Sequence, residues 1–337
     1  QATLQLDLLR ADQYPLVFEA ILPSPYTSLV STNFPEAYND GRSVAGQALY
    51  ARQAQRPDSN DPGTDAPDLR IWSDARGMYS SIDPGSLDSE GGTFLAGTDF
   101  LLNDVAILGL YVGGQSRENR NHGPGFQSDG PRFGVYGSYQ LAQNAYLTAV
   151  VGGGTSGASI DRTTAFGAQT NADIDRSDWF GRIEGGYTLY AEGFHITPFV
   201  GSQYTRGNYD SFTEDSGSVF ALSVDDWSAD RIEGFVGIDV SRSWSVSSTI
   251  ELTPYGRLTA RQTLDRDDPS ITAALNRGNG PSFTYSGSVP DGDGFEYGFG
   301  LRISGRQRPW SLSLGYTGFS ASDYETDQIN LGFSLGL

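Results

Sequence analysis

The segment "DQINLGFSLGL" at residues 327–337 alternates strictly between two kinds of side chain. From position 329 onward every odd residue is apolar, and every even residue is small or polar. Because successive side chains of a β-strand point to opposite faces, a strand here has one apolar face and one face that tolerates water. The apolar positions are Ile329, Leu331, Phe333, Leu335 and Leu337.

The same two-residue period recurs along the chain from about residue 69. In "GFEYGFGLRIS" at 294–304 and "DWFGRIEGGYTLY" at 178–190, charged residues lie on one face and apolar residues on the other. Strands are predicted at 69–81, 91–102, 104–116, 130–141, 144–157, 173–190, 194–206, 228–241, 245–263, 292–305, 310–319 and 327–337. The pattern therefore predicts about twelve antiparallel strands, most of them with the roughly 9–11 residues that a tilted strand needs to cross a bilayer.

The connections between these segments alternate in length. Tight links at 102–104, 142–144, 191–193, 241–244 and 305–309 alternate with long polar links at 82–90, 117–129, 158–172, 207–227 and 264–291. Aromatic residues near the strand ends are Tyr79, Trp179, Tyr187, Tyr204, Trp244, Trp310 and Tyr316. Short turns on one rim, long loops on the other and aromatic girdles are typical of a transmembrane β-barrel of the outer membrane, whose long loops face outside. A water-soluble sandwich or propeller also alternates and is the competing interpretation.

The composition limits the class of protein further. Among 337 residues only 37% are hydrophobic, yet 12% are aromatic and 43 are Gly, which favours many short strands over a disordered chain or a helical enzyme. No apolar run approaches the roughly 18 residues of a membrane helix, so a helical membrane protein is excluded. The chain has no Cys, and its 22 basic residues against 41 acidic ones give a net charge of −19, which argues against nucleic acid as a partner. A "GxxxxGK[ST]" motif is absent, so we expect no ATP site and no cofactor.

Residues 1–66 break the strand pattern. A helix is predicted at least from Pro35 or Glu36 to about Gln55, because small and apolar residues recur there on a helical spacing and Pro suits a first helical position. The segment "RPDSNDPGTDAPD" at 56–68 then ends it. Since the helix is rich in small residues and carries polar groups on several sides, it suits the narrow polar interior of a barrel.

These features together resemble a known family. The residues that carry the resemblance are "SPYTSLV" and "DGRSVAGQAL" ahead of the barrel, "GGTFLAGTDFLLND", "AILGLYVGGQS", "RFGVYGSYQL", "GRIEGGYTLYAEGFHITPFVGSQYTRGNYDSFTE" and the alternating final strand. In their order and spacing, over about residues 25–337, they resemble the translocator β-domain of autotransporters, the type V secretion family. The chain departs from the family's pattern in ending on Leu337, where many members end in Phe or Trp. No signal peptide precedes Gln1, so a mature or excised fragment is expected.

The resemblance implies a twelve-stranded outer-membrane barrel that acts as translocator and anchor for an N-terminal passenger. It implies a passenger remnant or extracellular linker at 1–33, a pore helix and linker at 34–66, and the barrel at 67–337. The N-terminus would face the cell surface and the C-terminus the periplasmic rim. Expected partners are outer-membrane lipid and lipopolysaccharide, the barrel-assembly machinery, which would read the odd positions from Ile329 to Leu337, and the passenger itself.

Inward-facing charges are expected to keep the lumen hydrated and to hold the pore helix near Asn39, Asp40 and Arg42. These lumen-facing residues are Arg182, Glu184, Arg231, Glu233, Glu251, Arg257, Glu296 and Arg302. The competing interpretation is that each of these residues forms an ion pair within the lumen and has no part in transport. Self-cleavage between Asn39 and Asp40 within the pore helix is a further alternative, which the chain running intact from Gln1 does not favour.

Two other classes of function are weighed against the translocator. An outer-membrane hydrolase would lie either in the barrel or in a missing passenger. The barrel has only His122 and His195 as bases near neutral pH, and no "GxSxG" elbow stands near a serine. The barrel itself is therefore not expected to be an enzyme, whereas a missing passenger could be one. A structural, partner-binding or porin-like barrel is the stronger alternative. The acidic segments "SNDPGTD", "LDRDDPS" and "PDGDGFE" lack the EF-hand ligand order and are expected to be solvated loops without a bound metal.

Overall fold

The computed structural model describes most of the chain. The described residues are 21–54, 68–82, 87–103, 105–119, 125–164, 167, 169–216, 218–275, 277–287, 289, 292–306 and 309–337.

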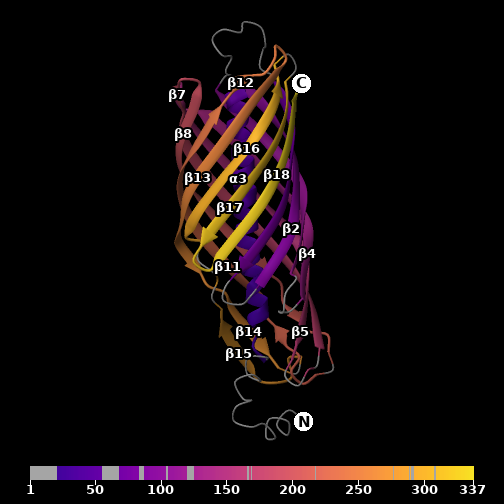
Figure 1. Cartoon of the computed structure of the whole chain (residues 1–337). Coiled ribbons are helices and arrows are strands. Elements are labelled where there is room, and N and C mark those ends of the chain that lie inside the picture. The colour runs from indigo at the N-terminus through magenta and orange to yellow at the C-terminus, as the bar shows by residue number, and fades with distance from the viewer. Residues whose placement is uncertain are drawn as a thin grey trace.

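Twelve antiparallel strands form a closed barrel, as predicted (Figure 1). They are β1 (Leu69–Ile82), β2 (Leu87–Asn103), β3 (Ala106–Asn119), β4 (Gly125–Gln140), β5 (Ala145–Thr163), β6 (Gln169–Tyr187), β8 (Phe194–Tyr209), β11 (Trp227–Arg242), β13 (Ile250–Asp267), β16 (Gly294–Gly305), β17 (Trp310–Ala321) and β18 (Tyr324–Gly336). The barrel closes where β1 pairs with β18, from Arg70 opposite Gly336 to Ile82 opposite Tyr324. The short strands β7 (Leu189–Ala191) and β12 (Trp244–Ser245) extend two of the tight turns.

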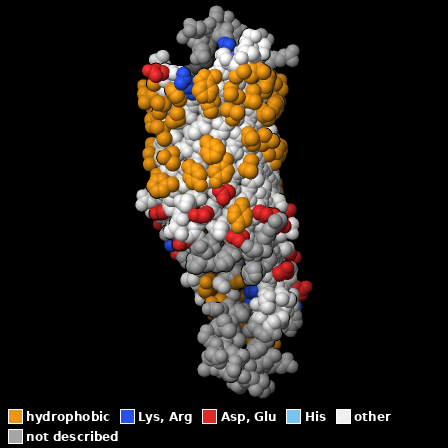
Figure 2. All heavy atoms as spheres, viewed as in Figure 1, with side chains coloured by type: hydrophobic (Ala, Val, Ile, Leu, Met, Phe, Trp, Pro, Cys, Tyr) orange, Lys and Arg blue, Asp and Glu red, His pale blue; other side chains and the backbone are white. Residues whose placement is uncertain are grey.

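The phase of the alternation is also as predicted. In β18, Ile329 and Leu331 are 63% and 50% exposed on the outer wall, whereas Gln328 and Ser334 are each 4% exposed and face inward. On the visible face of the barrel, Figure 2 shows the outward apolar side chains as a band, with acidic residues gathered at its lower edge. Among the described residues, no helix is both long and apolar enough to cross a membrane.

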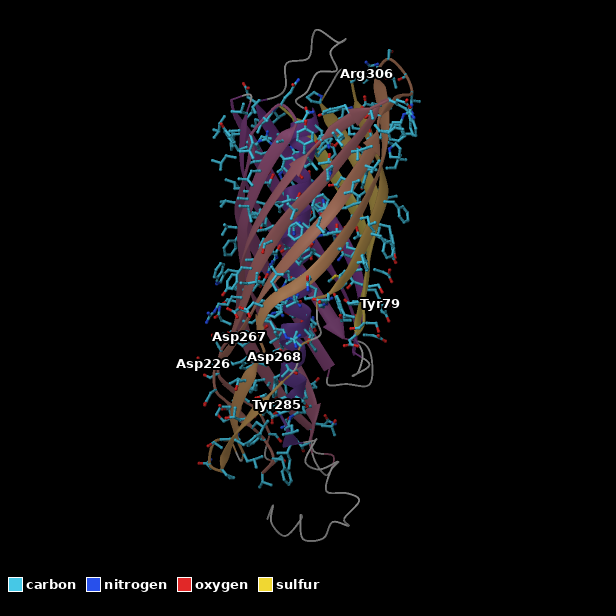
Figure 3. The ribbon with its side chains drawn as sticks, turned by 90° about the vertical axis from the view of Figure 1, so that its left-hand side faces the viewer. Tyr79, Asp226, Asp267, Asp268, Tyr285 and Arg306 are labelled. Atoms are coloured by element: carbon cyan, nitrogen blue, oxygen red, sulfur yellow. The ribbon has the colours of Figure 1, made fainter. Side chains whose placement is uncertain are left out.

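The two rims of the barrel differ. We call the end that carries the tight turns the short-turn rim; Arg306 and the end of β18 lie there (Figures 1 and 3). We call the opposite end the long-loop rim; Tyr79 lies at the barrel edge on that side, and Asp226, Asp267 and Asp268 lie close to it (Figure 3). The acidic loops therefore gather at one end of the apolar band.

A long helix, α3 (Ser24–Ala54), runs through the barrel (Figure 1). It ends close to the predicted Gln55 and begins earlier than the predicted minimum of Pro35 or Glu36, so that Pro35 lies inside the helix and not at its first position. An internal proline costs about 3 kcal/mol in lost hydrogen bonding and steric clash. Burial of Tyr26, Leu29 and Phe34 around the earlier turns offsets that cost. The predicted boundary between segments 1–33 and 34–66 consequently falls within one continuous helix.

Beyond the long-loop rim the loops form a second sheet, which the sequence did not predict. Its strands, in spatial order, are β15 (Ser282–Ser286), β14 (Ser270–Ala274), β10 (Ser223–Val224) and β9 (Phe212–Thr213). Figure 1 places β14 and β15 beside the first turns of α3, and Figure 3 places Tyr285 well beyond the barrel edge. The links predicted as polar loops at 207–227 and 264–291 therefore carry ordered strands.

Glycines let aromatic rings lie flat against the inner wall. A Cβ at Gly109 would overlap Cζ of Tyr136, and a Cβ at Gly300 would overlap the hydroxyl of Tyr255. Since real Cβ atoms do not approach other atoms so closely, each ring needs the glycine on the neighbouring strand. The rings add little thickness to the wall, which leaves the lumen wide enough for a helix.

The orientation of β18 can be tested by placing one arginine on each face. Leu331→Arg should destabilise the folded barrel by about 2–4 kcal/mol if it lies near the middle of the membrane, because it puts a cation into hydrocarbon. Asn330→Arg should be nearly neutral, because Asn330 faces the lumen, where its Nδ2 lies 3.2 Å from Oγ1 of Thr317. The measurement is the fraction of heat-modifiable, folded barrel on electrophoresis. Equal losses for the two variants would contradict the assigned phase.

Candidate functional site

The lumen is occupied by α3, which packs against one side of the barrel wall. Small residues of the helix, Ala37, Val44, Ala45 and Ala48, form one apolar cluster with wall residues from β1 to β6. The wall residues of this cluster are Trp72, Leu95, Ile107, Tyr111, Tyr136, Val150 and Phe180. At Gly41 the approach is so close that a Cβ would lie 2.5 Å from Oε1 of Gln203. The helix is therefore seated against β1–β6 and β8 and not centred in the lumen.

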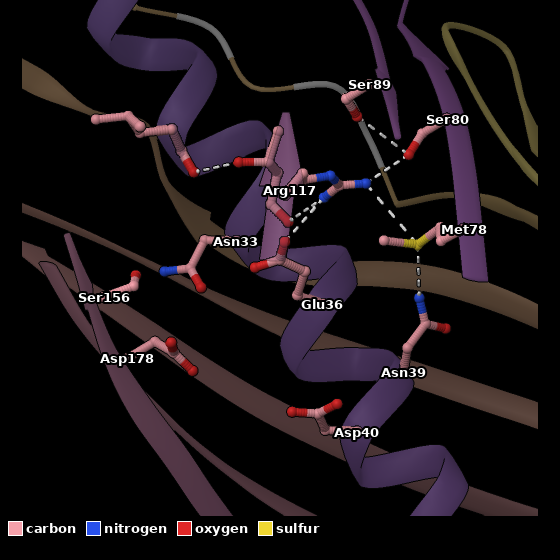
Figure 4. Close-up of polar contacts among 12 residues, drawn as sticks. Asn33, Glu36, Asn39, Asp40, Met78, Ser80, Ser89, Arg117, Ser156 and Asp178 are labelled. Carbon is pink, nitrogen blue, oxygen red and sulfur yellow. Dashed lines mark hydrogen bonds and ion pairs between the residues drawn. The ribbon is translucent and has the colours of Figure 1, made fainter. Parts of the chain in front are cut away.

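Acidic side chains of the helix bind arginines of that wall. Oε1 of Glu36 lies 3.2 Å from Nη1 of Arg117, and Oε2 lies 3.3 Å from Nη2 of Arg176. Figure 4 shows Glu36 and Arg117 pointing toward each other, with Ser80 beside the guanidinium. Arg117 also donates to the carbonyl of Thr32, at 3.1 Å. Glu36 thus joins α3 to β3 and β6.

One turn further along, Asp40 binds two more wall arginines. It accepts a hydrogen bond from Nη2 of Arg76 and another from Nε of Arg132, the latter at 2.7 Å. Arg132 is 1% exposed and also pairs with Asp178 on β6. Burying charges is costly unless they are paired and hydrogen-bonded, so this arrangement fixes both the depth and the rotation of the helix.

The other two predicted pore-helix residues also contact the wall. Nη1 of Arg42 lies 3.3 Å from Oε1 of Glu296, and its Nη2 donates to Oε1 of Gln328 at 2.8 Å. The side-chain amide of Asn39 points toward the sulfur of Met78, at 3.7 Å (Figure 4). Both residues lie within the continuous helix, and the carboxylate of Asp40 is held between two guanidinium groups. That carboxylate is therefore not a free base for the cleavage chemistry considered at Asn39.

Most of the predicted lumen-facing residues form further ion pairs, which involve β6, β11, β13 and β16. Glu184 accepts from Arg182 at 2.8 Å and lies 3.4 Å from Nη2 of Arg257. Glu233 lies 2.7 Å from Arg261 and 3.4 Å from Arg231. Of the eight predicted residues, only Glu296 forms an ion pair with a described residue of α3.

Three of the predicted arginines, Arg231, Arg182 and Arg302, contact the helix through its aromatic rings instead. The guanidinium carbon of Arg231 lies 4.8 Å from the ring centre of Phe34. That of Arg182 lies 5.1 Å from the ring centre of Tyr38, and that of Arg302 lies 3.8 Å from the ring centre of Tyr50. Glu251 shares the inward face of β13 with buried Thr253. Within the described ranges neither Glu251 nor Arg302 has an ion-pair partner.

Sequence reasoning missed the residues that grip α3 most closely. These are Glu36 on the helix and Arg76, Arg117, Arg132 and Arg176 on the wall, with Asp178 as the wall partner of Arg132. Arg76 and Arg132 carried a usable signal, since each is a charge on the polar face of an alternating segment, in "DARGMY" and "PRFGVY". The pairing of these two arginines with Asp40, and of Arg117 and Arg176 with Glu36, carried none, because it depends on where the helix sits.

The first turns of α3 are held outside the barrel by the second sheet. We call the sheet of β9, β10, β14 and β15, with the described links around its strands and the long-loop ends of β4, β5, β6, β8 and β11, the loop clasp. Its apolar core contains Tyr26, Leu29, Val30, Phe34, Phe126, Ala158, Ile160, Ala172, Ile174, Tyr209, Leu222, Val224, Trp227, Ala229, Ile271, Ala273 and Val289. Since four of these residues belong to α3, the helix supplies part of the core on which the loops fold.

A buried polar cluster ties the helix to the loop clasp. The hydroxyl of Tyr26 donates to Glu214, which also accepts from Nε and Nη2 of Arg162 at 2.7 and 2.6 Å. Burial, together with the neighbouring Glu214 carboxylate, raises the pKa of the Tyr26 hydroxyl above its usual range. The hydroxyl therefore stays protonated and remains a hydrogen-bond donor to Glu214.

The alternative chemistries find little support at the described residues. His195 lies near the short-turn rim, its ring centre 4.9 Å from that of Tyr190, and His122 lies outside the described residues. In the described part of the chain, no three His, Asp or Glu side chains converge to hold a metal ion. In the acidic segment at 264–270, Asp268 pairs with Arg266 at 3.3 Å. The segment "SNDPGTD" lies outside the described residues.

Comparison with known proteins gives one family and a set of similar folds. The family model of the autotransporter β-domain matches residues 71–317. The chain is similar to the translocator domain of the autotransporter NalP from Neisseria meningitidis, with a TM-score of 0.64, 15% identity, and coverage of 88% of this chain and 98% of that one. It is also similar to the β-domain of the Bordetella autotransporter BrkA, with a TM-score of 0.61, 16% identity, and coverage of 80% and 100%. No curated protein sequence matches significantly.

Removal of the Asp40 carboxylate tests the grip on the helix. Asp40→Ala leaves Arg76 and Arg132 without their shared partner and should cost about 3–5 kcal/mol of the free energy of unfolding, as breaking a buried pair does. Asp327→Ala is the matched control, because Asp327 is an exposed carboxylate bonded to Tyr316 on the outer surface and should change the free energy by less than about 1 kcal/mol. Denaturant unfolding in detergent measures both. Similar losses would mean that the lumen pairs do not hold α3.

Proposed function

The chain belongs to the autotransporter β-domain family, and from that premise we propose that its lumen passes an N-terminal passenger to the cell surface and is afterwards closed by α3. As a member of this family, the chain forms a translocator barrel of the outer membrane, which is a transport structure and not an enzyme. Membership also implies an N-terminal passenger. The observation that carries the proposal is the helix itself, which occupies the lumen and is bound to the wall by Glu36, Asp40 and Arg42.

The direction of α3 supports an outward route for the passenger. Tyr26, near its start, contacts Glu214 of the loop clasp. Near its end, Nη2 of Arg52 donates to the carbonyl of Val105, in a tight turn of the short-turn rim, at 3.1 Å. The helix thus runs from the long-loop rim to the short-turn rim. Since long loops of such barrels face outside, a passenger ahead of α3 would stand at the cell surface and Leu337 at the periplasmic rim.

The loop clasp supplies a reason for the helix to stay where it is. Full burial of a large apolar side chain stabilises by about 1.5–3 kcal/mol. Leu29, Val30 and Phe34 gain this burial only when the helix has reached the long-loop rim. Docking of the helix in the lumen needs no nucleotide, because the loop clasp and the lumen ion pairs favour one final position of the linker. In this proposal 24–54 form the pore helix and 69–336 the barrel.

The apolar residues on the outer face of β18 support the proposal that the odd positions from Ile329 to Leu337 are an assembly signal. Ile329, Leu331, Phe333 and Leu337 are exposed and Leu335 is half-buried on the outer face of the strand that closes the barrel. This row is accessible before closure, so the barrel-assembly machinery would bind it there. Lipid would then cover the apolar band, and lipopolysaccharide the long-loop end.

Passage of the passenger is tested with an epitope fused ahead of Gln1. In intact cells the epitope should be accessible to antibody and to added protease. A second epitope placed after Leu337 is the matched control and should become accessible only after the outer membrane is permeabilised. Detection of the first epitope only after permeabilisation, with the barrel folded, would contradict the proposed orientation.

Closure by α3 is tested by single-channel conductance. The full chain should give small, brief currents, because the helix occupies most of the lumen, and deletion of 1–66 should give a large steady pore. Asp40→Arg within the full chain is a second variant, since it places a third cation beside Arg76 and Arg132 and should lengthen the open time. A large steady pore in the unaltered chain would instead favour the porin-like alternative.

A further inference from the structure

A cavity of about 190 Å³ remains in the lumen beside the second half of α3. It lies between the helix and β11, β13, β16, β17 and β18, and Asp74 of β1 also lines it. The lining residues that bear on its chemistry are Gly46 and Tyr50 of the helix and Tyr255, Arg302, Ser313 and Asn330 of the wall. At ~30 Å³ per water molecule, it has room for several waters or for a small organic ion.

Glycines keep this space open. A Cβ at Gly46 would have no atom within 4 Å, so alanine would fit there without a clash. Glycine in a helix interior is about 1 kcal/mol less favourable than alanine. The packing around position 46 does not require a glycine, because it leaves room for a Cβ. Gly41 is different, since its Cβ would clash with Gln203. On the facing wall, the Tyr255 ring lies flat over Gly300 and Gly315 and leaves the volume unfilled.

The charges that line the cavity do not fully pair. Six charged side chains contribute: Arg42, Asp74, Asp239, Arg257, Glu296 and Arg302. Five have an opposite charge within 4.0 Å, namely Arg42 with Glu296, Asp74 with Arg76, and Asp239 with Arg257. Arg302 has no such partner among the described residues. Glu251, on the inward face of neighbouring β13, forms no ion pair with it.

The surroundings of Arg302 hold its side chain in place without neutralising it. Its guanidinium carbon lies 3.8 Å from the ring centre of Tyr50 and 5.4 Å from that of Tyr255. Stacking on a ring occupies the face of the guanidinium plane, whereas its five N–H donors lie within the plane. An arginine cannot lose its proton in a protein, so the charge persists. The in-plane donors remain available for an acceptor in the cavity.

We propose that this cavity binds a small anion bearing a carboxylate, sulfonate or phosphate group, with Arg302 as its cationic partner. Guanidinium groups match the oxygen pairs of such anions in two parallel hydrogen bonds. Because α3 and the barrel wall each supply part of the lining, the anion binds only when the helix is docked. Binding therefore stabilises the docked helix by RT ln(1 + [L]/Kd). The site requires α3 in the lumen, but it does not depend on passage of a passenger.

The absence of Cys allows a direct test with thiol probes of opposite charge. Ser313→Cys places one thiol in the cavity, since Ser313 pairs with Arg302 across β16 and β17. Anionic sulfonatoethyl methanethiosulfonate should modify this thiol about tenfold faster than the cationic trimethylammonium reagent, when each rate is divided by the rate of the same reagent with a free thiol. A tenfold preference is the effect expected from one partly solvated positive charge nearby. Arg302→Gln in the same chain should abolish the preference. Inorganic phosphate should slow labelling when Arg302 is present and have no effect in R302Q.

Two matched variants separate charge from access. Ser247→Cys lies in an exposed turn of the short-turn rim and should react with both reagents at similar normalised rates, whether or not Arg302 is present. Gly46→Leu, combined with S313C, should fill the cavity and slow both reagents alike at the cavity thiol.

Every variant is first checked for heat-modifiable migration. Equal rates at the cavity thiol, a preference that survives R302Q, or a cavity thiol that neither reagent reaches would overturn the proposal. Loss of surface display with the anion preference intact would contradict the translocator proposal alone.

Discussion

The rest of the molecule depends on the pairing of β1 with β18. Backbone N–H and C=O groups find no partner in hydrocarbon, so a membrane sheet cannot leave an edge open. The two strands pair without interruption from Arg70 opposite Gly336 to Ile82 opposite Tyr324. Closure in turn creates the two environments that the alternating side chains need. Leu331 meets the apolar exterior, while Gln328 meets the lumen.

The wall against which α3 is seated carries lumen-facing arginines that lack enough carboxylate partners on the wall itself. Arg76, Arg117, Arg132 and Arg176 all project from the wall against which α3 is seated. Two carboxylates of the helix, Glu36 and Asp40, bind all four. The helix therefore acts as the counter-charge of that wall as well as its packing partner. Where the helix stands away from the wall, Arg302 retains its charge beside a cavity, which links the eccentric seating of α3 to the proposed anion site.

The sequence predicted the barrel well because its signal is local. A strand with lipid on one face and a wet lumen on the other must alternate apolar and polar side chains. The number of strands, their order along the chain and the face that each residue occupies could therefore be predicted from the two-residue period. The turns of α3 before Pro35 were not predicted, because Pro35 is a local start signal that burial of Leu29 and Phe34 in the clasp overrides. The clasp strands β9 and β10 have only two residues each, too few to show any period.

The contacts that hold the helix were not predictable for a different reason. Glu36 binds arginines that are 81 and 140 residues away in the sequence, and nothing in either neighbourhood encodes the depth or rotation of α3. That position is set jointly, by close approach at Gly41, by the lumen ion pairs, and by the apolar clasp beyond the rim. Each of the three acts on a different turn of the same rigid helix. A shift of one turn would therefore break all three together, which makes the docked position a single cooperative state and not a sum of independent contacts.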